Sequence, residues 1–169
     1  DIVHDLKNLD NPVSAIGFIV AGLKQRYENK QKAFTALSCD NLPNNGEVLE
    51  KVILQFAQKI SPALADWIKA NATFPGTMID RIVPATTEDD RRDIEARLNV
   101  NGESVRDEGM VVCEPFSQWV VEDKFADGRP AWEKVGVLLV NDVRVFEKIK
   151  LRLLNGAHST MAYTGYLSG

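Results

Sequence analysis

The sequence predicts an α/β fold that is followed by a helical segment, and two patterns carry this prediction. Up to about residue 141, short apolar runs of strand length alternate with amphipathic runs of helical period. After residue 141 the apolar pattern is helical only, so we place a domain change at this point. At 169 residues with 44 % hydrophobic side chains, the chain is long enough to bury a core.

The first half of the chain is expected to form helices around one short strand. Residues 1–10 are polar and predict a solvated loop or a helix end, and His4 within them is given no role. Asn44 and Glu47 fit a capping arrangement in front of an apolar helical face. The expected elements are a helix at 12–30, a strand at 34–39, a helix at 44–60 and a helix from Pro62 to Ala70.

The second half is expected to contain short strands, one charged helix and the final helix. Thr87 and Asp90 match a capping box, and Asn141 or Asp142 can cap the last helix, which begins near Val143. The expected elements are a strand at 77–83, an exposed helix at 86–98, a polar loop at 99–109, two extended pieces within 110–125 that break at Glu114-Pro115, a turn at 128–130 and an apolar run at 135–140.

Bulk composition excludes several classes of partner. The net charge of −4 gives no basic surface for nucleic acid or for an anionic membrane. No apolar run reaches the ~18 residues that span a bilayer, and no signal peptide is visible.

Two distant cysteines, Cys39 and Cys113, fit a reduced protein, so we expect a cytoplasmic location. The oligomeric state is left open, with a monomer as one option. Because the chain starts at Asp1 without Met, we expect an interior fragment.

The stretch from Val145 to Gly165 combines apolar residues nearly all round with four polar groups. We expect this helix to be buried, and it carries Glu147, Lys150, Asn155 and His158. At ~100° per residue the four lie within an arc of about 140°. One interpretation is a satisfied core network in which Lys150 pairs with Glu147. The other is a site, because a buried ammonium needs a partner or a ligand.

Three further polar residues lie within or just after predicted strands. Asn41 comes two residues after the strand at 34–39, where α/β sheets place their ligands, although an asparagine there also forms loops. Asp80 and Arg81 lie within the strand at 77–83, which predicts either a buried ion pair or a site at the strand end. Scattered histidines and cysteines give no zinc-ligand spacing, and no phosphate-binding glycine motif is present.

Four stretches resemble the polyol-specific long-chain dehydrogenases, the mannitol dehydrogenase family. They are SCDNLPNNG at 38–46, FPGTMIDRIVP at 74–84, CEPFSQWVVEDKF with GRPAWEKVG at 113–136, and KLRLLNGAHS at 150–159. Their order and spacing match the family, and the last, a lysine with Asn five and His eight residues on, is its catalytic signature. Ile79 stands where valine is usual.

The resemblance implies a fold and an activity. Residues 1–141 would be the latter part of a Rossmann-like NAD(P)-binding domain, and residues 142–169 the first helices of the C-terminal helical domain. The implied reaction is metal-independent hydride transfer between NAD or NADP and a sugar alcohol or keto-sugar, with D-mannitol and D-fructose favoured. The main cofactor-binding loop is absent from this chain. Fructuronate or tagaturonate reductase is the alternative, and a non-catalytic carbohydrate-binding or structural module is the alternative of another class.

The resemblance also implies roles for individual residues. Lys150 would be the general acid and base, and the amides of Asn41 and Asn155 would stabilise the developing alkoxide. His158 would orient Lys150 or a substrate hydroxyl, and Glu147 would pass the proton to solvent. The residues implied to lie near the nicotinamide or the substrate are Asp80, Ile79 and Arg81.

Overall fold

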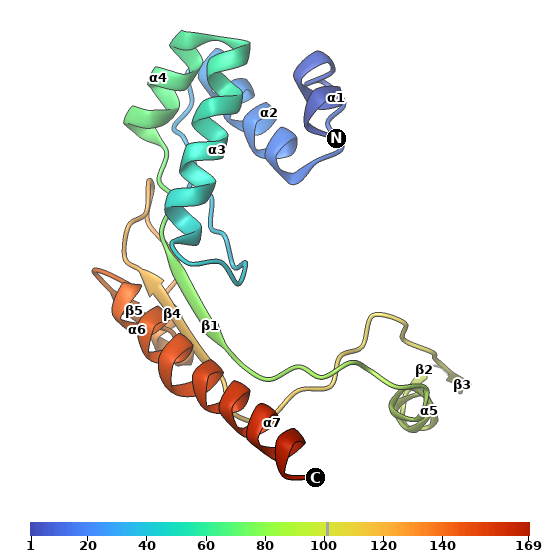
Figure 1. Ribbon diagram of the computed structural model, residues 1–169. Helices are drawn as coiled ribbons and strands as arrows, with labels where there is room; N and C mark the ends of the chain where they lie inside the picture. The colour runs from blue at the N-terminus through green and yellow to red at the C-terminus, as the bar shows by residue number, and fades with distance from the viewer. Residues whose placement is uncertain (101) are drawn as a thin grey trace. The chain divides into compact units, whose positions relative to one another are not determined.

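The computed structural model describes residues 1–100 and 102–169, which form two compact units (Figure 1). The first unit comprises Asp1–Ile79 and Trp119–Gly169, and the second comprises Asp80–Gln118. Helices and short strands are both present, so the predicted α/β class is confirmed. Among the described residues, no helix has the length and apolar character needed to cross a membrane.

The N-terminal part of the first unit is helical and holds the larger hydrophobic core. Its most buried members include Leu23 of α2, Ile53 and Phe56 of α3, and Ile68 of α4. These positions follow the helical spacing read from the sequence, and Ser61 caps α4 ahead of Pro62 as its first residue. The helices are α1 (Ile2–Lys7), α2 (Ala15–Glu28), α3 (Asn45–Ile60) and α4 (Pro62–Asn71).

The polar N-terminus is more ordered than the sequence suggested. Residues 2–7 form α1, and the carboxylate of Asp5 within it is fully buried. It accepts hydrogen bonds from the backbone N–H of Val13 at 2.9 Å and of Ser14 at 2.9 Å, and from Ser14 Oγ at 2.5 Å. His4 Nδ1 lies 3.0 Å from the same carboxylate. Asp5 therefore fixes the chain that enters α2, because Ser14 is the N-cap of that helix.

We expect Asp5→Ala to lower the melting temperature by roughly 5 °C or more, because three hydrogen-bond donors, the N–H groups of Val13 and Ser14 and the Ser14 hydroxyl, lose their acceptor. Burial alone would raise the pKa of Asp5, but the hydrogen bonds from Ser14, His4 and Val13 outweigh it and hold the pKa well below the usual range. The ionised Asp5 carboxylate therefore stabilises the folded protein above about pH 4, where an unfolded carboxyl is also ionised. This stabilisation is lost as the pH falls below that value. Thermal unfolding at pH 7 and pH 3, with exposed Asp10→Ala as control, measures this. A pH-independent difference would contradict it.

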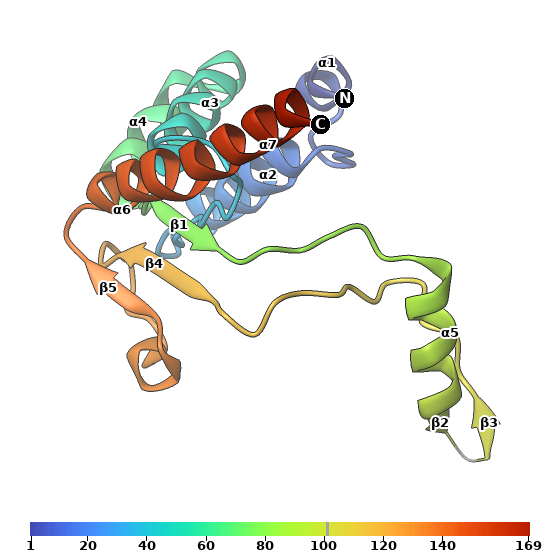
Figure 2. The ribbon, with the colours of Figure 1, turned by 60° about the horizontal axis from the view of Figure 1, so that its bottom comes forward.

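A small three-stranded sheet forms the second layer of the first unit. Its strands are β1 (Thr77–Asp80), β4 (Gln118–Glu122) and β5 (Leu138–Val140), in the order β1-β4-β5. β4 and β5 are parallel, and the arrows of β1 and β4 point in opposite directions in Figure 2. Met78, Val120 and Val143 form a second core between this sheet and the following helix. The strand predicted at 77–83 thus ends at Asp80, and the run at 135–140 contributes only its last three residues after a 3₁₀ turn, η1 (Trp132–Val135).

The strand predicted at residues 34–39 is wrong. This segment is extended but forms a single parallel bridge, between Thr35 and Thr73. The partner segment offers few further ladder positions, because α4 ends at Asn71 and Pro75 has no N–H to donate. The extended segment still carries the chain from the helical core to the loop that contains Asn41.

The final helix is continuous but is not buried, in contrast to the prediction. It runs through α6 (Arg144–Ile149), a π-helical turn η2 (Lys150–Asn155) and α7 (Gly156–Ser168). Every residue from 157 to 169 is exposed, including Tyr166 at 87 %. Apolar residues bury only where another element covers them, and in the described part of the chain the sheet covers only the start of α6, at Val143 and Phe146.

The second unit is built around α5 (Glu88–Arg97). The predicted capping box is confirmed, since Thr87 Oγ1 accepts from the N–H of Asp90 and the Asp90 carboxylate accepts from the N–H of Thr87. The loop predicted from residue 99 instead begins as a hairpin of β2 (Asn99–Val100) and β3 (Glu103–Ser104), and position 101 lies outside the described residues. Residues 110–114 are extended without becoming a strand, and the Glu114 N–H donates to the carbonyl of Ile82.

Candidate active site

The loop after the extended segment turns sharply into α3. Asn44 adopts a left-handed backbone with φ of 53°, which asparagine tolerates better than most residues. Its side chain makes no capping hydrogen bond to the helix, so the predicted capping arrangement with Glu47 is wrong. The turn directs residues 39–43 towards the end of β1 and the start of the final helix, where all three segments border one pocket.

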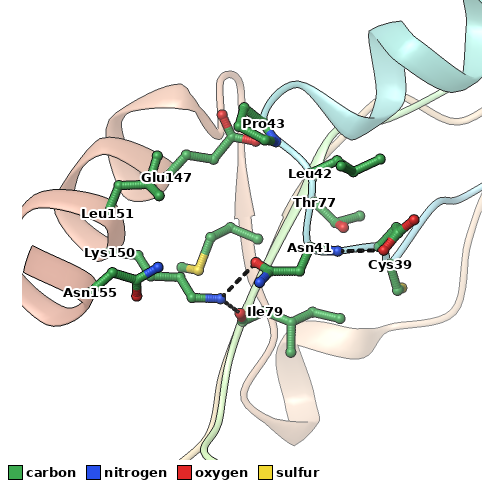
Figure 3. A pocket seen from close by; sticks show the side chains of 12 residues that line it. Cys39, Asn41, Leu42, Pro43, Thr77, Ile79, Glu147, Lys150, Leu151 and Asn155 are labelled. Atoms are coloured by element: carbon green, nitrogen blue, oxygen red, sulfur yellow. Dashed lines mark hydrogen bonds between the residues drawn. The ribbon is translucent and has the colours of Figure 1, made fainter. Parts of the chain in front are cut away.

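This pocket has about 520 Å³ of empty space, open solvent included, and its walls come from a loop, a strand and a helix (Figure 3). Lys150 and Asn155 enter from the helix, while Asn41 faces them from the loop. The lining residues are Cys39, Asp40, Asn41, Leu42, Pro43, Thr77, Met78, Ile79, Glu147, Lys150, Leu151 and Asn155.

Lys150 is held between the loop and the strand. Its Nζ donates to Asn41 Oδ1 at 3.3 Å and to the backbone carbonyl of Ile79 (Figure 3). The side chain is half-buried, and its ammonium borders the pocket. Residues separated by more than a hundred positions in the sequence therefore meet at one charged group.

The interpretation in which Lys150 forms an ion pair with Glu147 is wrong, because Glu147 contacts another group. Glu147 Oε1 accepts from the backbone N–H of Asn44 at 3.0 Å, which ties the helix to the turn before α3. No ion pair joins Glu147 to Lys150 in the described ranges 1–100 and 102–169. Glu147 nevertheless lines the same pocket as Lys150.

The contact with Lys150 fixes the orientation of the Asn41 amide. An ammonium only donates hydrogen bonds, so Asn41 must turn its oxygen towards Lys150. Its Nδ2 then remains as a donor, and no acceptor for it is found among the described residues. Asn41 thus offers N–H groups beside an ammonium, which suits a ligand oxygen that gains negative charge.

A π-helical turn brings Asn155 to the pocket. In a regular α-helix a residue five positions on lies about 140° away from the first. Here residues 150–155 form a π-helix, in which hydrogen bonds run from i to i+5, as in the bond from the Gly156 N–H to the Leu151 carbonyl. Residues five apart then fall near the same face, so Lys150 and Asn155 line one pocket.

Three of the remaining predicted site residues are not among those that line the described pocket. His158 is exposed on α7 and is not among the residues that line the described pocket. Asp80 is half-buried and Arg81 is exposed, and both belong to the second unit. Arg81 Nε donates to the carbonyl of Glu114 at 3.0 Å, so the interpretation of a buried Asp80–Arg81 ion pair is wrong. Ile79 lines the pocket.

Two buried residues behind the loop were missed in the sequence. Asn45 and Thr77 are 2 % and 3 % exposed, and they hydrogen-bond to each other and to the loop. The sequence gives no signal that singles out Asn45, because Asn-Asn-Gly ahead of a helix is typical of loops. No cluster of three or more His, Cys, Asp or Glu side chains that could hold a metal is found in the part of the chain that the structure describes.

Two models of known protein families match this chain. A family model described as the mannitol dehydrogenase Rossmann domain matches residues 7–134. The chain belongs to the mannitol dehydrogenase family. A second model, the mannitol dehydrogenase C-terminal domain, matches residues 142–169. The resemblance noted in the sequence motifs is thereby confirmed.

Individual relatives within this family differ in their named substrates. D-mannonate oxidoreductase of Escherichia coli (strain K12) is 52 % identical over 168 residues, which cover 99 % of this chain and 34 % of the relative. The ternary complex of Pseudomonas fluorescens mannitol 2-dehydrogenase with NAD and D-mannitol is 48 % identical, with a TM-score of 0.82 over 98 % of this chain and 33 % of that one. A substrate-free D-sorbitol dehydrogenase structure is 43 % identical, with a TM-score of 0.89 over 99 % of this chain and 34 % of that one. The chain thus spans about a third of the length of these relatives.

Proposed function

We propose that this chain forms part of an NAD(P)-dependent oxidoreductase that interconverts a polyol and a keto-sugar, with D-mannitol and D-fructose as the favoured pair. The observation that carries the proposal is the ammonium of Lys150 bonded to Asn41 in an open pocket that Asn155 also lines. Membership of the mannitol dehydrogenase family supports it. In this proposal residues 1–141 belong to the nucleotide-binding domain and residues 142–169 open the helical domain.

Lys150 is the proposed general acid and base. In reduction its ammonium gives a proton to the substrate oxygen as the carbonyl carbon gains a hydride, and in oxidation the neutral amine removes the hydroxyl proton. The amide N–H groups of Asn41 and Asn155 stabilise the alkoxide-like oxygen between these states. Glu147 is the proposed route by which the proton on Lys150 exchanges with solvent, because it lines the same pocket.

A nicotinamide cofactor, when bound, supplies or accepts the hydride. The donor set of the pocket fits the substrate side of this chemistry, since one ammonium and two carboxamides converge where an oxygen would be polarised. No glycine-rich phosphate-binding motif occurs in the 169 residues, so we assign no pyrophosphate contact to this chain.

The family's implied roles for Asp80, Arg81 and His158 remain proposals that no contact in the pocket supports.

The charges of the pocket favour a neutral polyol. Asp40 and Glu147 both line it, and Lys150 is the cation that borders it among the described residues. A sugar acid would bring a further carboxylate towards these two, which costs affinity unless another cation is supplied. The second candidate is therefore a keto-sugar acid such as fructuronate or tagaturonate. It is kept because the relative at 52 % identity is named D-mannonate oxidoreductase.

An assay of the full-length protein with paired substrates tests this proposal. We expect NAD(P)H oxidation with fructose to exceed that with fructuronate and tagaturonate in kcat/KM by about tenfold or more, which corresponds to about 1.4 kcal/mol of discrimination. Measurement of each substrate with NADH and with NADPH assigns the cofactor. A preference for fructuronate would favour the second candidate. Absence of turnover with every substrate would favour a carbohydrate-binding module.

We further propose a cytoplasmic location. Cys39 and Cys113 are both unpaired thiols, which is typical of a reducing compartment. The acidic net charge gives no support for a nucleic-acid partner.

A further inference from the structure

The side chain of Asn45 makes four hydrogen bonds inside the protein. It is the first residue of α3 and is 2 % exposed. Its Nδ2 donates to the carbonyl of Asp40 at 3.0 Å, to the carbonyl of Thr77 at 3.1 Å and to Thr77 Oγ1 at 2.9 Å. Its Oδ1 accepts from the Thr77 N–H at 2.9 Å. One amide therefore joins a helix, a strand and a loop.

Thr77 adds a second connection between the same strand and loop. Its hydroxyl donates to the carbonyl of Ser38 at 2.6 Å while it accepts from Asn45. Ser38 and Asp40 are therefore both fixed to β1, one through Thr77 and one through Asn45. The short loop between them has little freedom to shift relative to the strand.

This cluster stands directly behind the two acceptors of Lys150. Asn41, whose Oδ1 accepts from Lys150, follows Asp40 in the chain. Ile79, whose carbonyl also accepts from Lys150, lies two residues after Thr77 on the same strand. The relative position of the two acceptors is thus determined by the hydrogen bonds that Asn45 and Thr77 make.

The glycine beside Asn45 lets the helix approach the strand closely. A Cβ at Gly46 would lie 2.7 Å from the N of Gly76 and 2.7 Å from the carbonyl O of Phe74. The backbone of α3 therefore sits directly on the segment that enters β1, which only glycine allows. This close approach allows the amide of Asn45 to reach Thr77, and the hydrogen bonds between the two residues then fix its position.

We propose that Asn45, acting with Thr77, is a positioning residue that sets the geometry of Asn41 and Lys150 for proton transfer. Asn45 does not line the described pocket, and its effect passes through the loop and the strand. The inference rests on the proposed function. A displacement of about 1 Å at a reacting group lowers rates by up to about 10²-fold, so loss of this cluster affects turnover more than cofactor binding.

Thr77→Val in the full-length protein is the main test. It removes both hydroxyl hydrogen bonds and keeps the size and shape of the side chain. We expect kcat with the polyol to fall about 10- to 100-fold, the affinity for NAD to stay within about twofold, and the pH profile of kcat to shift, because the acceptors of Lys150 move. Thr77→Ser retains the hydroxyl and is expected to restore most of kcat and the wild-type pH profile.

Thr35→Val is the matched control. Thr35 Oγ1 lies 2.8 Å from Thr73 Oγ1 and accepts from the N–H of Ala126, so its hydroxyl is equally engaged but does not border the pocket. We expect a similar loss of stability with kcat and the pH profile unchanged. Equal kcat and pH profiles in the Thr77→Val and Thr35→Val variants would overturn the inference. Inactivity of the wild-type protein would instead overturn the proposed function.

Asn45→Asp provides an independent arm. It keeps the shape of the side chain but turns its donor nitrogen into an acceptor that faces two carbonyls. If the variant folds, we expect a loss of kcat at least as large as that of Thr77→Val, and wild-type kcat would overturn the inference. If it does not fold, the comparison of Thr77→Val with Thr35→Val and Thr77→Ser decides.

Discussion

Replacement of Lys150 by alanine is expected to lower kcat of the full-length protein with a polyol by about 10³- to 10⁴-fold, the upper range for loss of a general acid or base. Lys150 is the group placed to exchange a proton with a ligand in the pocket, and its ammonium contacts Asn41 and Ile79. Binding of NAD is expected to stay near wild type, because no phosphate-binding role falls on this residue. Steady-state kinetics and a fluorescence titration with NADH measure the two effects separately.

Lys148→Ala is the control for this variant. Lys148 is exposed on the same helix, two residues earlier, and does not line the pocket within the described residues. It is expected to retain kcat within about twofold, in the range usual for surface changes. A small primary amine added to Lys150→Ala is expected to restore part of the rate, since it replaces the missing base. Turnover of Lys150→Ala close to wild type would exclude the assigned role.

The second large effect is expected for Asn155→Ala. Loss of one donor to a developing oxyanion costs about 10²- to 10³-fold in kcat. Asn155 reaches the pocket through the π-turn at 150–155, which puts it on the face of Lys150. The change is expected to reduce kcat and kcat/KM equally, because the interaction strengthens only in the transition state. Single-turnover measurement of NADH formation isolates this step.

Asn71→Ala provides the matched control, because Asn71 is an exposed helical asparagine whose Nδ2 donates to the carbonyl of Trp67 at 2.8 Å. It is expected to leave the rate of NADH formation unchanged. An Asn155→Ala variant that raises KM while kcat stays constant would show that Asn155 contributes to ground-state binding only, and would remove it from the proposed alkoxide-stabilising pair.

Local sequence rules predicted the elements that depend on neighbouring residues. The apolar period around Ile53 and Phe56 identified α3, and the capping box of Thr87 and Asp90 identified the start of α5. Both signals lie within a few residues of the element that they define, so no tertiary contact is needed to interpret them. The α/β class followed from the alternation of such elements.

Local sequence rules could not predict the features that depend on contacts between distant residues. The segment at 34–39 has the composition of a strand, but Pro75 in the facing segment limits its ladder to one bridge. A helical wheel also assumes a constant angle per residue, so the π-turn that aligns Asn155 with Lys150 could not be read from it. The burial predicted for the final helix required a covering element that the described residues do not supply.

In the candidate site too, the sequence indicated some residues, while others are recognised only from their contacts in the structure. The motif at 150–159 and the resemblance to a family indicated Lys150, Asn41 and Asn155, and the three line one pocket in the structure. The motif could not indicate Asn45, because its importance lies in four hydrogen bonds to partners up to 32 residues away. Residues that position a site carry no chemistry of their own, and only their contacts reveal them.

A crystal structure of the full-length protein with NAD and D-mannitol tests the central claim most directly. We expect one secondary hydroxyl oxygen of the polyol to lie within hydrogen-bond reach, about 2.6–3.2 Å, of Lys150 Nζ and of the amide nitrogens of Asn41 and Asn155. Lys150 would then have exchanged at least one of its present acceptors for the substrate. A polyol bound with no hydroxyl in reach of Lys150 would contradict the account.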